Sequence, residues 1–229
     1  ERWGDGSQID ESSPEQILLT TACALFGLRD SLTKELADRG LTKLYQELEL
    51  PIADLLALME NRGIAVDKKG LETLATFFDG EVARETKIAH DAAGHEFNVG
   101  SPKQLQVVLF DELGLPKTKK IKTGYTTDAD ALTWLFEKTS HPLLAALLRI
   151  RETKKLATTI EGLLVEIQND KRIHTHFAQT VAATGRLSSV GPNLQNIPVR
   201  TEEGRKIRGC FIAGSGYDAL LTDNYSQIE

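Results

Sequence analysis

The chain has 229 residues and a mass of 25.2 kDa, with 41% hydrophobic and 26% charged residues. These proportions are close to the globular average and exclude wholesale disorder and collagen-like structure. No apolar run approaches the roughly 20 residues of a membrane span, no secretory signal is visible, and two cysteines are too few for a disulfide framework. We therefore expect a soluble intracellular protein, with no membrane partner.

Charge is distributed unevenly along the chain. Residues 1–100 carry 10 Lys and Arg against 19 Asp and Glu, whereas residues 101–229 carry 17 against 14. The net charge of −6 can therefore conceal a basic face confined to the second half of the chain, which is a first indication of function. When charge is considered alone, ordinary variation in solvated surface charge is the simpler explanation.

The first part of the chain predicts helices. Residues 1–12 are polar and glycine-rich and predict a loop, after which Ser13-Pro14-Glu15 has the residue types of a helix N-terminus. Apolar residues then recur at helical spacing, and Gly40, Gly63 and Gly94 stand where the helical patterns stop. The helices predicted here cover residues 14–28, 31–39, 49–61 and 69–93.

The second part predicts further helices and then strands. A short helix is expected after Ser101, an exposed loop over 115–130, and helices over 130–137 and 142–168. The alternation of residues 173–181 predicts a half-buried strand, and 211–213 and 219–222 are β-like runs around a turn. The expected class is therefore α+β, mainly helical and ending in the first antiparallel strands of a sheet. Because so short a sheet cannot satisfy its edges, we expect it to be truncated at residue 229.

Residues 184–200 form the segment richest in chemistry: Thr-Gly-Arg-Leu-Ser-Ser-Val-Gly-Pro-Asn-Leu-Gln-Asn-Ile-Pro-Val-Arg. Short polar side chains on an irregular backbone suit a surface that must place hydrogen-bond donors accurately. The DNA minor groove presents acceptors on every base pair, so Arg, Asn and Gln donors there test pair geometry and not sequence. From composition alone, a polar loop with Asx turns is the simpler interpretation.

The order of residues in this segment is recognisable. Residues 184–200, followed by Tyr-Ser-Gln-Ile-Glu at 225–229, resemble family A DNA polymerases, the bacterial DNA polymerase I type. The similarity extends more weakly back to residue 49, through segments 61–67, 97–105, 109–115 and 172–175. The resemblance implies that residues 1–48 end a 3′–5′ exonuclease-like domain, 49–67 form a palm-associated helix, 68–170 form the thumb, and 171–229 begin the palm.

The implied function is that of a DNA-directed DNA polymerase. It would add deoxynucleoside triphosphates to a primer 3′-hydroxyl on primer–template DNA, with two Mg²⁺ ions, as a monomer in repair and replication. A cytoplasmic, nucleoid-associated location is expected, and residues 1–229 alone are expected to be inactive. One alternative is a non-catalytic module that binds duplex DNA. A nuclease is a third possible function, but the motif Tyr-x-x-x-Asp of active exonuclease domains is absent around Leu18–Phe26. The exonuclease-like domain is therefore expected to be inactive.

The resemblance also implies the residues that contact DNA. Four lysines within residues 117–122 lie at the thumb tip, where they supply charge to phosphates, and Arg186 reaches the minor groove at the primer terminus. A flexible solvated loop and an ordinary exposed helix face are the structural alternatives for the lysines. The implied DNA-binding residues are Lys119, Lys120, Lys122, Thr123, Lys154, Lys155, Thr158, Arg186, Asn193, Gln195 and Asn196.

The implied nucleotide and metal site lies at the end of the chain. Ser226, Gln227, Glu229 and Arg200 would contact the nucleotide, Glu229 by excluding a ribose 2′-hydroxyl, and the Tyr225 backbone carbonyl would bind a metal ion. The implied catalytic residues are Asn224, Tyr225 and Glu229.

Residue 224 departs from the family pattern, which has a metal-binding aspartate there. Asn224 offers a neutral oxygen where Mg²⁺ prefers a carboxylate, and Asp223 is a doubtful substitute because neighbouring strand residues face opposite sides. Three explanations for Asn224 are open: an engineered inactivating change, a local slip of the chain that lets Asp223 bind the metal, or a natural non-catalytic variant. We favour the first.

One further metal candidate is the pair His174 and His176, which an uninterrupted strand would place on one face. A half-exposed alternating strand explains the pair without zinc.

Overall fold

The computed structural model describes residues 13–122 and 124–222, and it divides into two compact units between Met59 and Glu60. The helices are α1 (Pro14–Asp38), α2 (Thr42–Leu44), η1 (Tyr45–Glu49), α3 (Leu50–Arg62), α4 (Lys68–Ala93), α5 (Pro102–Gln106), η2 (Val107–Glu112), α6 (Ala129–Thr139), α7 (Pro142–Val165), η3 (Leu194–Asn196) and α8 (Glu202–Gly209). The strands are β1 (Ile64–Val66), β2 (Lys120–Ile121), β3 (Gly124–Tyr125), β4 (Arg172–Ile173), β5 (His176–Ala178), β6 (Ser188–Val190) and β7 (Phe211–Ile212). The predicted α+β class is confirmed.

The first unit is dominated by α1, a single helix of 25 residues. Its N-terminus is the predicted one, with the Ser13 hydroxyl accepting a hydrogen bond from the Gln16 N–H at 3.2 Å. The predicted division into two helices near residue 30 is wrong, because neither glycine nor proline interrupts residues 28–39. No residue of α1 is buried.

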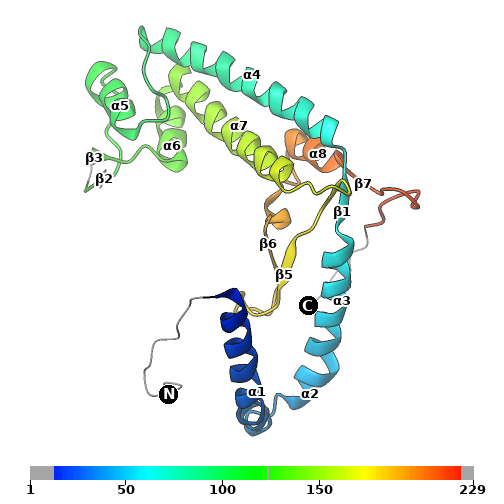
Figure 1. Ribbon diagram of the computed structural model, residues 1–229. Coiled ribbons are helices and arrows are strands. Elements are labelled where there is room, and N and C mark those ends of the chain that lie inside the picture. The colour runs from blue at the N-terminus through cyan, green and yellow to red at the C-terminus, as the bar shows by residue number, and fades with distance from the viewer. Residues whose placement is uncertain (1–12, 123, 223–229) are drawn as a thin grey trace. The chain divides into compact units, whose positions relative to one another are not determined.

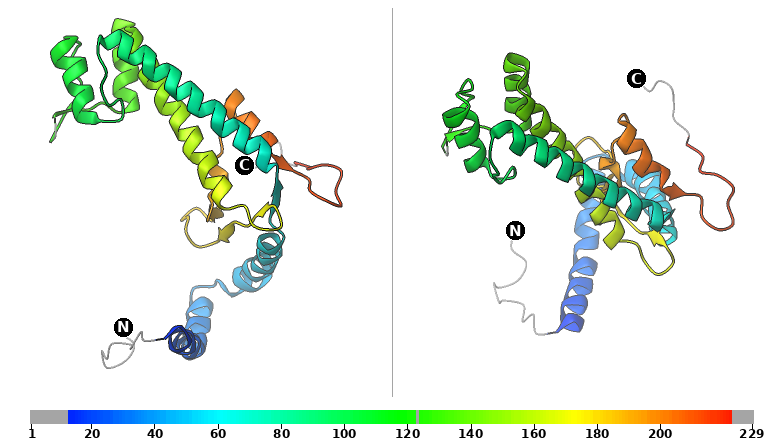
Figure 2. Two further views of the ribbon diagram at one scale, coloured as in Figure 1. Left: turned by 45° about the horizontal axis from the view of Figure 1, so that its top comes forward. Right: turned by 90° about the horizontal axis from the view of Figure 1, so that it is seen from above.

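The frame of the second unit is the pair α4 and α7, which run side by side (Figures 1 and 2). Asp67 caps the start of α4 by accepting from the Gly70 N–H at 3.1 Å, and α4 stops at Gly94, whose φ of 82° suits glycine. Ten residues of α7 are buried, so this helix is the central element of the unit.

Two apolar clusters lie along this frame. The first joins the end of α4 to α5, η2, α6 and the start of α7 and includes Leu105, Leu109, Leu132, Leu144 and Leu147. The second joins β1, α4, the remainder of α7, β4 and α8 and includes Leu71, Phe78, Ile160, Ile173 and Ile207. Each cluster therefore fixes one end of the α4–α7 pair.

Within the described residues, three small antiparallel sheets complete the second unit. One has the strand order β4-β1-β7, with Ile64 opposite Ile173 and Ala65 opposite Ile212. The others are the hairpin pairs β2-β3 and β5-β6. Each of these strands is two or three residues long, which explains why the sequence pattern predicted few of them.

Two strand predictions are wrong. The run 173–181 divides into β4 and β5 in different sheets, because the His174 ring bonds to the end of α3 and the Thr175 hydroxyl enters a buried polar cluster. The run 219–222 forms no strand among the described residues.

Helix α8 was not predicted from the sequence. Thr201 caps it by accepting from the Gly204 N–H at 3.1 Å, and Glu202 and Glu203 stand in its first turn. It contacts both α4 and α7, so it joins the end of the 184–200 segment to the central pair.

Candidate nucleic-acid interface

Buried hydroxyl groups hold the 184–200 segment together from inside. The Thr175 Oγ1 lies 2.6 Å from the Ser189 Oγ and 2.8 Å from the Pro192 carbonyl oxygen, and the Leu194 N–H donates to the Ser189 Oγ at 3.2 Å. Ser189 is 1% exposed and Thr175 is 6% exposed. Since each hydroxyl carries one proton, these distances fit a chain in which Leu194 donates to Ser189, Ser189 to Thr175, and Thr175 to the Pro192 carbonyl. This chain of bonds joins β5, β6 and the start of η3.

The predicted DNA-contacting residues of this segment lie on its solvent-exposed side. Arg186, Asn193, Gln195 and Asn196 are all exposed. The Gln195 Nε2 donates to the Leu187 carbonyl at 3.1 Å, which ties η3 to the residue beside Arg186. The Asn193 Oδ1 accepts from the Gln195 N–H at 3.0 Å, so Asn193 has its amide N–H groups left to offer a ligand.

The predicted lysines of residues 117–122 belong to a small anchored hairpin. Lys120 pairs with Tyr125 across β2 and β3, and Lys119, Lys120 and Lys122 are exposed; Thr123 lies outside the described residues. The Tyr125 N–H donates to the Gln106 Oε1 at 2.9 Å, and the Tyr125 ring meets that of Phe110 at 5.4 Å between centroids. The hairpin that carries the lysines is therefore fixed to α5 and η2.

The predicted residues of α7 also lie on an exposed side. Lys154, Lys155 and Thr158 are exposed, whereas the neighbouring Leu156 and Ala157 are buried. The helical period therefore separates a basic outer face from the core.

Sequence reasoning missed Arg149 and Arg151 on the same helix. A surface pocket is lined by both arginines and Lys155, together with residues of α6. The Arg149 Nη2 is already paired with the Glu203 Oε1 at 2.8 Å, which raises the pKa of Arg149 and lowers that of Glu203. Arg151 precedes Lys155 by four residues, a spacing that puts both on one helix face and could have indicated it.

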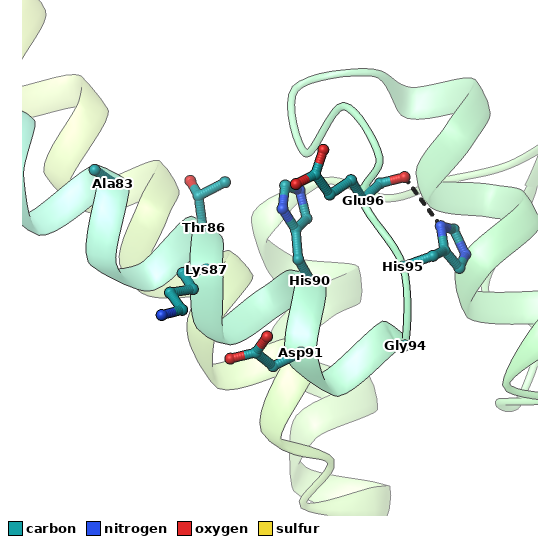
Figure 3. A pocket seen from close by; sticks show the side chains of 8 residues that line it. All are labelled: Ala83, Thr86, Lys87, His90, Asp91, Gly94, His95 and Glu96. Atoms are coloured by element: carbon teal, nitrogen blue, oxygen red, sulfur yellow. Dashed lines mark hydrogen bonds between the residues drawn. The ribbon is translucent and has the colours of Figure 1, made fainter.

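A second pocket lies beside the C-terminal half of α4 (Figure 3). Its two imidazoles hold the chain after α4: the His90 Nε2 lies 2.8 Å from the Phe97 carbonyl oxygen, and the His95 Nδ1 lies 3.0 Å from the Glu96 carbonyl oxygen. The His95 Nε2 also lies 2.7 Å from the Glu112 carboxylate, and this bond is the largest cause of a raised His95 pKa. None of the predicted site residues lines this pocket.

The described residues contain no group of three or more His, Cys, Asp or Glu side chains able to hold a metal ion. The His174 Nδ1 lies 2.7 Å from the Glu60 carbonyl oxygen and its Nε2 lies 3.0 Å from the Asp170 carboxylate. Both ring nitrogens of His174 already face oxygen atoms of this chain, so the zinc interpretation of His174 and His176 is not supported.

The predicted nucleotide and metal site falls largely outside the described residues. Those outside are Asp223, Asn224, Tyr225, Ser226, Gln227 and Glu229. Arg200 is described and exposed, immediately before the Thr201 cap of α8. Within residues 13–122 and 124–222, no helix has both the length and the apolar character needed to cross a membrane.

Comparison with known proteins identifies relatives of this chain. The chain is 53% identical over 222 residues to DNA polymerase I of Mycobacterium bovis, which covers 96% of this chain and 25% of that protein. It is 43% identical over 210 residues to DNA polymerase I of Bacillus subtilis, which covers 91% and 24%. The chain thus spans about a quarter of the length of the curated relatives it matches.

A solved structure is similar as well: the POL domain of Pol1 from M. smegmatis in complex with DNA primer–template and dNTP. It is 55% identical with a TM-score of 0.81, and the match covers 86% of this chain and 35% of that one. The family model for DNA polymerase family A matches residues 68–229. The resemblance is confirmed: the chain belongs to DNA polymerase family A.

Proposed function

We propose that this chain is the part of a DNA-directed DNA polymerase that holds the primer–template duplex. In this proposal residues 1–48 end an exonuclease-like domain, 49–67 form a palm-associated helix, 68–170 are the thumb, and 171–229 begin the palm. Family membership supports it, and so does the bound DNA of the M. smegmatis structure. The single observation that carries it is the buried hydroxyl chain, which holds together the 184–200 segment on which Arg186 and Asn193 are exposed.

Binding combines two kinds of contact. Lysines of the β2–β3 hairpin and of α7 neutralise phosphates, which supplies affinity without sequence preference. Arg186 and the side-chain amides of Asn193, Gln195 and Asn196 donate to minor-groove acceptors at the primer terminus, which tests base-pair geometry. The thumb therefore holds the duplex while the 184–200 segment checks it.

Catalysis in this proposal belongs to the complete polymerase. Magnesium ions, when bound, would neutralise the triphosphate and lower the pKa of the primer hydroxyl. Of the residues that the family pattern assigns to the metal, Tyr225 offers a backbone carbonyl, but residue 224 is an amide and not a carboxylate. This donor set fits the ions incompletely, because hard cations prefer charged oxygen ligands. The proposed role of Arg200, Ser226, Gln227 and Glu229 is to orient the deoxynucleoside triphosphate.

The second candidate function is a duplex-binding module without catalysis, which Asn224 favours. A monomeric protein located with the nucleoid in the cytoplasm fits either function. DNA binding is common to both, whereas only the first includes primer extension.

The binding test uses the 229-residue chain and a labelled primer–template duplex, measured by fluorescence anisotropy at several salt concentrations. Affinity is expected to fall steeply with salt, because each lysine–phosphate contact releases a counterion. Lys155→Ala is expected to weaken binding several-fold and to reduce the salt slope by about 1. Lys43→Ala is the control, because Lys43 is 81% exposed and lies in the first unit. A flat salt response, or equal effects of the two substitutions, would contradict the proposal.

A further inference from the structure

The C-terminal end of α3 is capped by two side chains: Arg172, which lies in β4, and His174, which directly follows β4. The His174 Nδ1 lies 2.7 Å from the Glu60 carbonyl oxygen, and the Arg172 Nε donates to the Arg62 carbonyl at 2.7 Å. The last carbonyls of a helix lack partners within the helix and carry partial negative charge, so cationic donors there are stabilising. Packing at this point is close: a Cβ on Gly63, whose φ is 60°, would lie 2.7 Å from the Ile173 carbonyl oxygen and 2.8 Å from the His174 ring.

The geometry around His174 indicates its protonation state. Its Nδ1 faces a carbonyl oxygen, and its Nε2 lies 3.0 Å from the Asp170 Oδ2. Neither oxygen carries a proton to donate when Asp170 is ionised, so both bonds form only when both ring nitrogens carry protons. The two acceptors, which come from different parts of the chain, therefore favour the imidazolium form of His174.

This histidine stands at the root of the hairpin that leads to Arg186. The next residue, Thr175, enters the buried hydroxyl chain. Beyond it, the Glu60 carboxylate accepts from the Phe177 N–H at 2.6 Å and lies 3.3 Å from the His176 Nδ1. Glu60 thus contacts β5 through its carboxylate and His174 through its carbonyl, which joins α3 to the start of the β5–β6 hairpin.

We propose that His174, as an imidazolium between Glu60 and Asp170, is a positioning residue for primer–template binding. It fixes the root of the β5–β6 hairpin and thereby the placement of Arg186. The inference rests on the proposed function, since Arg186 must contact DNA for its placement to matter. Loss of the His174 proton would remove one of the two bonds and loosen the hairpin without unfolding the core.

The charged groups that face His174 set the direction of its pH dependence. The Glu60 carbonyl is the largest cause of a raised His174 pKa, and Asp170 also raises it, whereas burial and Arg172 oppose the shift. The hydrogen bond from His174 is the largest cause of a lowered Asp170 pKa. The pKa of Glu60 is lowered, mainly by the Phe177 N–H and then by His176.

The signs of these shifts define a pH window. A raised histidine pKa means that its contribution is complete below the ordinary histidine pKa and is lost as pH rises through the raised value. A lowered aspartate pKa means that its contribution is lost as pH falls through the lowered value. Affinity for DNA should therefore be highest between the two values and decline on the alkaline side as His174 loses its proton.

The test follows duplex affinity of the 229-residue chain at constant ionic strength from about pH 6 to about pH 9, a range that brackets a raised histidine pKa. The pKa of His174 is measured separately by NMR of its imidazole. Wild-type affinity is expected to fall several-fold with a midpoint equal to that pKa. Asp170→Asn should move both midpoints to lower pH together, and His174→Gln should bind several-fold more weakly with a flat profile.

A matched control is available in the same unit. Glu112→Gln removes the carboxylate of the His95–Glu112 pair. The 2.7 Å bond of this pair also raises a histidine pKa, but neither residue contacts the β5–β6 hairpin through it. This substitution should leave the binding profile unchanged. An Arg186→Ala background provides a second check, because His174→Gln should then have no further effect on affinity if it acts through Arg186.

The outcomes separate the inference from the function beneath it. Two results would overturn the inference alone, provided that binding still depends on salt. In one, the pH profile of binding does not follow the His174 pKa; in the other, Asp170→Asn and Glu112→Gln change the profile equally. Absence of salt-dependent duplex binding by the wild type would overturn the proposed function and the inference with it. If His174→Gln does not fold, as judged by circular dichroism, the comparison of Asp170→Asn with Glu112→Gln decides the question.

Discussion

Replacing Asn224 by aspartate is expected to raise primer extension by about two orders of magnitude or more, because a metal ligand regains its charge. The substitution is made in a full-length polymerase that carries this segment, since this chain spans about a quarter of the length of its relatives. A carboxylate neutralises a hard dication that an amide oxygen contacts only weakly. Extension of a labelled primer, followed over time with Mg²⁺ present, measures the change.

The neighbouring aspartate provides the control for this prediction. Asp223→Asn should leave extension by the Asn224→Asp enzyme nearly intact, because the family pattern has its metal-binding aspartate at residue 224 and not at 223. If Asp223→Asn abolishes extension by the polymerase that retains Asn224, the explanation in which a local slip lets Asp223 bind the metal is correct. Unchanged extension after Asn224→Asp would reject an inactivating change and favour a natural non-catalytic variant.

Replacing Gly204 by alanine is expected to destabilise the second unit by about 3 kcal/mol, the upper part of the usual range for overpacking. Gly204 is buried in the first turn of α8, where an added Cβ would lie 2.8 Å from the Pro198 carbonyl carbon. Backbone cannot yield as a flexible side chain can, so α8 must move away from the end of the 184–200 segment. Urea unfolding followed by circular dichroism measures the loss.

Gly162→Ala is the matched control, because Gly162 lies within α7 and an added Cβ there meets nothing within 4 Å. Alanine is the better helix former, so this change should stabilise the chain by about 1 kcal/mol. Equal effects of the two substitutions would contradict the close contact between α8 and Pro198.

The outer ends of the long helices α1 and α4 were predictable because their end signals are local. Ser13-Pro14 starts α1 as predicted, and α4 begins within one residue of its predicted start and stops at Gly94 as predicted. Such caps satisfy backbone groups of the same helix, so sequence alone contains the relevant contacts.

The strands depended on partners distant in sequence and were harder to predict. β1 has only three residues, and it exists because residues more than a hundred positions away, in β4 and β7, pair with both of its edges. Residues 173–181 alternate as a strand should, yet the bonds of His174 to Glu60 and of Thr175 to Pro192 interrupt the run. Period-two alternation cannot reveal such tertiary bonds.

The candidate site likewise combines residues that the local sequence reveals with residues that depend on distant partners. The exposed donors Arg186, Asn193 and Gln195 were predictable, since they stand in a contiguous motif. The groups that hold them, Thr175 and Glu60, were not, because a buried hydroxyl or a helix-end carboxylate has no signature until its partners are placed. Arg151 was missed although its spacing from Lys155 could have indicated it.

The central claim is that Arg186 donates to a minor-groove acceptor at the primer terminus. The most direct measurement compares affinity for a duplex with purine N3 at the primer-terminal pair against one in which a C–H replaces N3, for the wild type and Arg186→Ala. Loss of one charged hydrogen bond should weaken wild-type binding about tenfold. The account predicts that Arg186→Ala binds both duplexes equally and that replacing the major-groove N7 affects neither protein. An equal penalty from the N3 replacement in both proteins would contradict it.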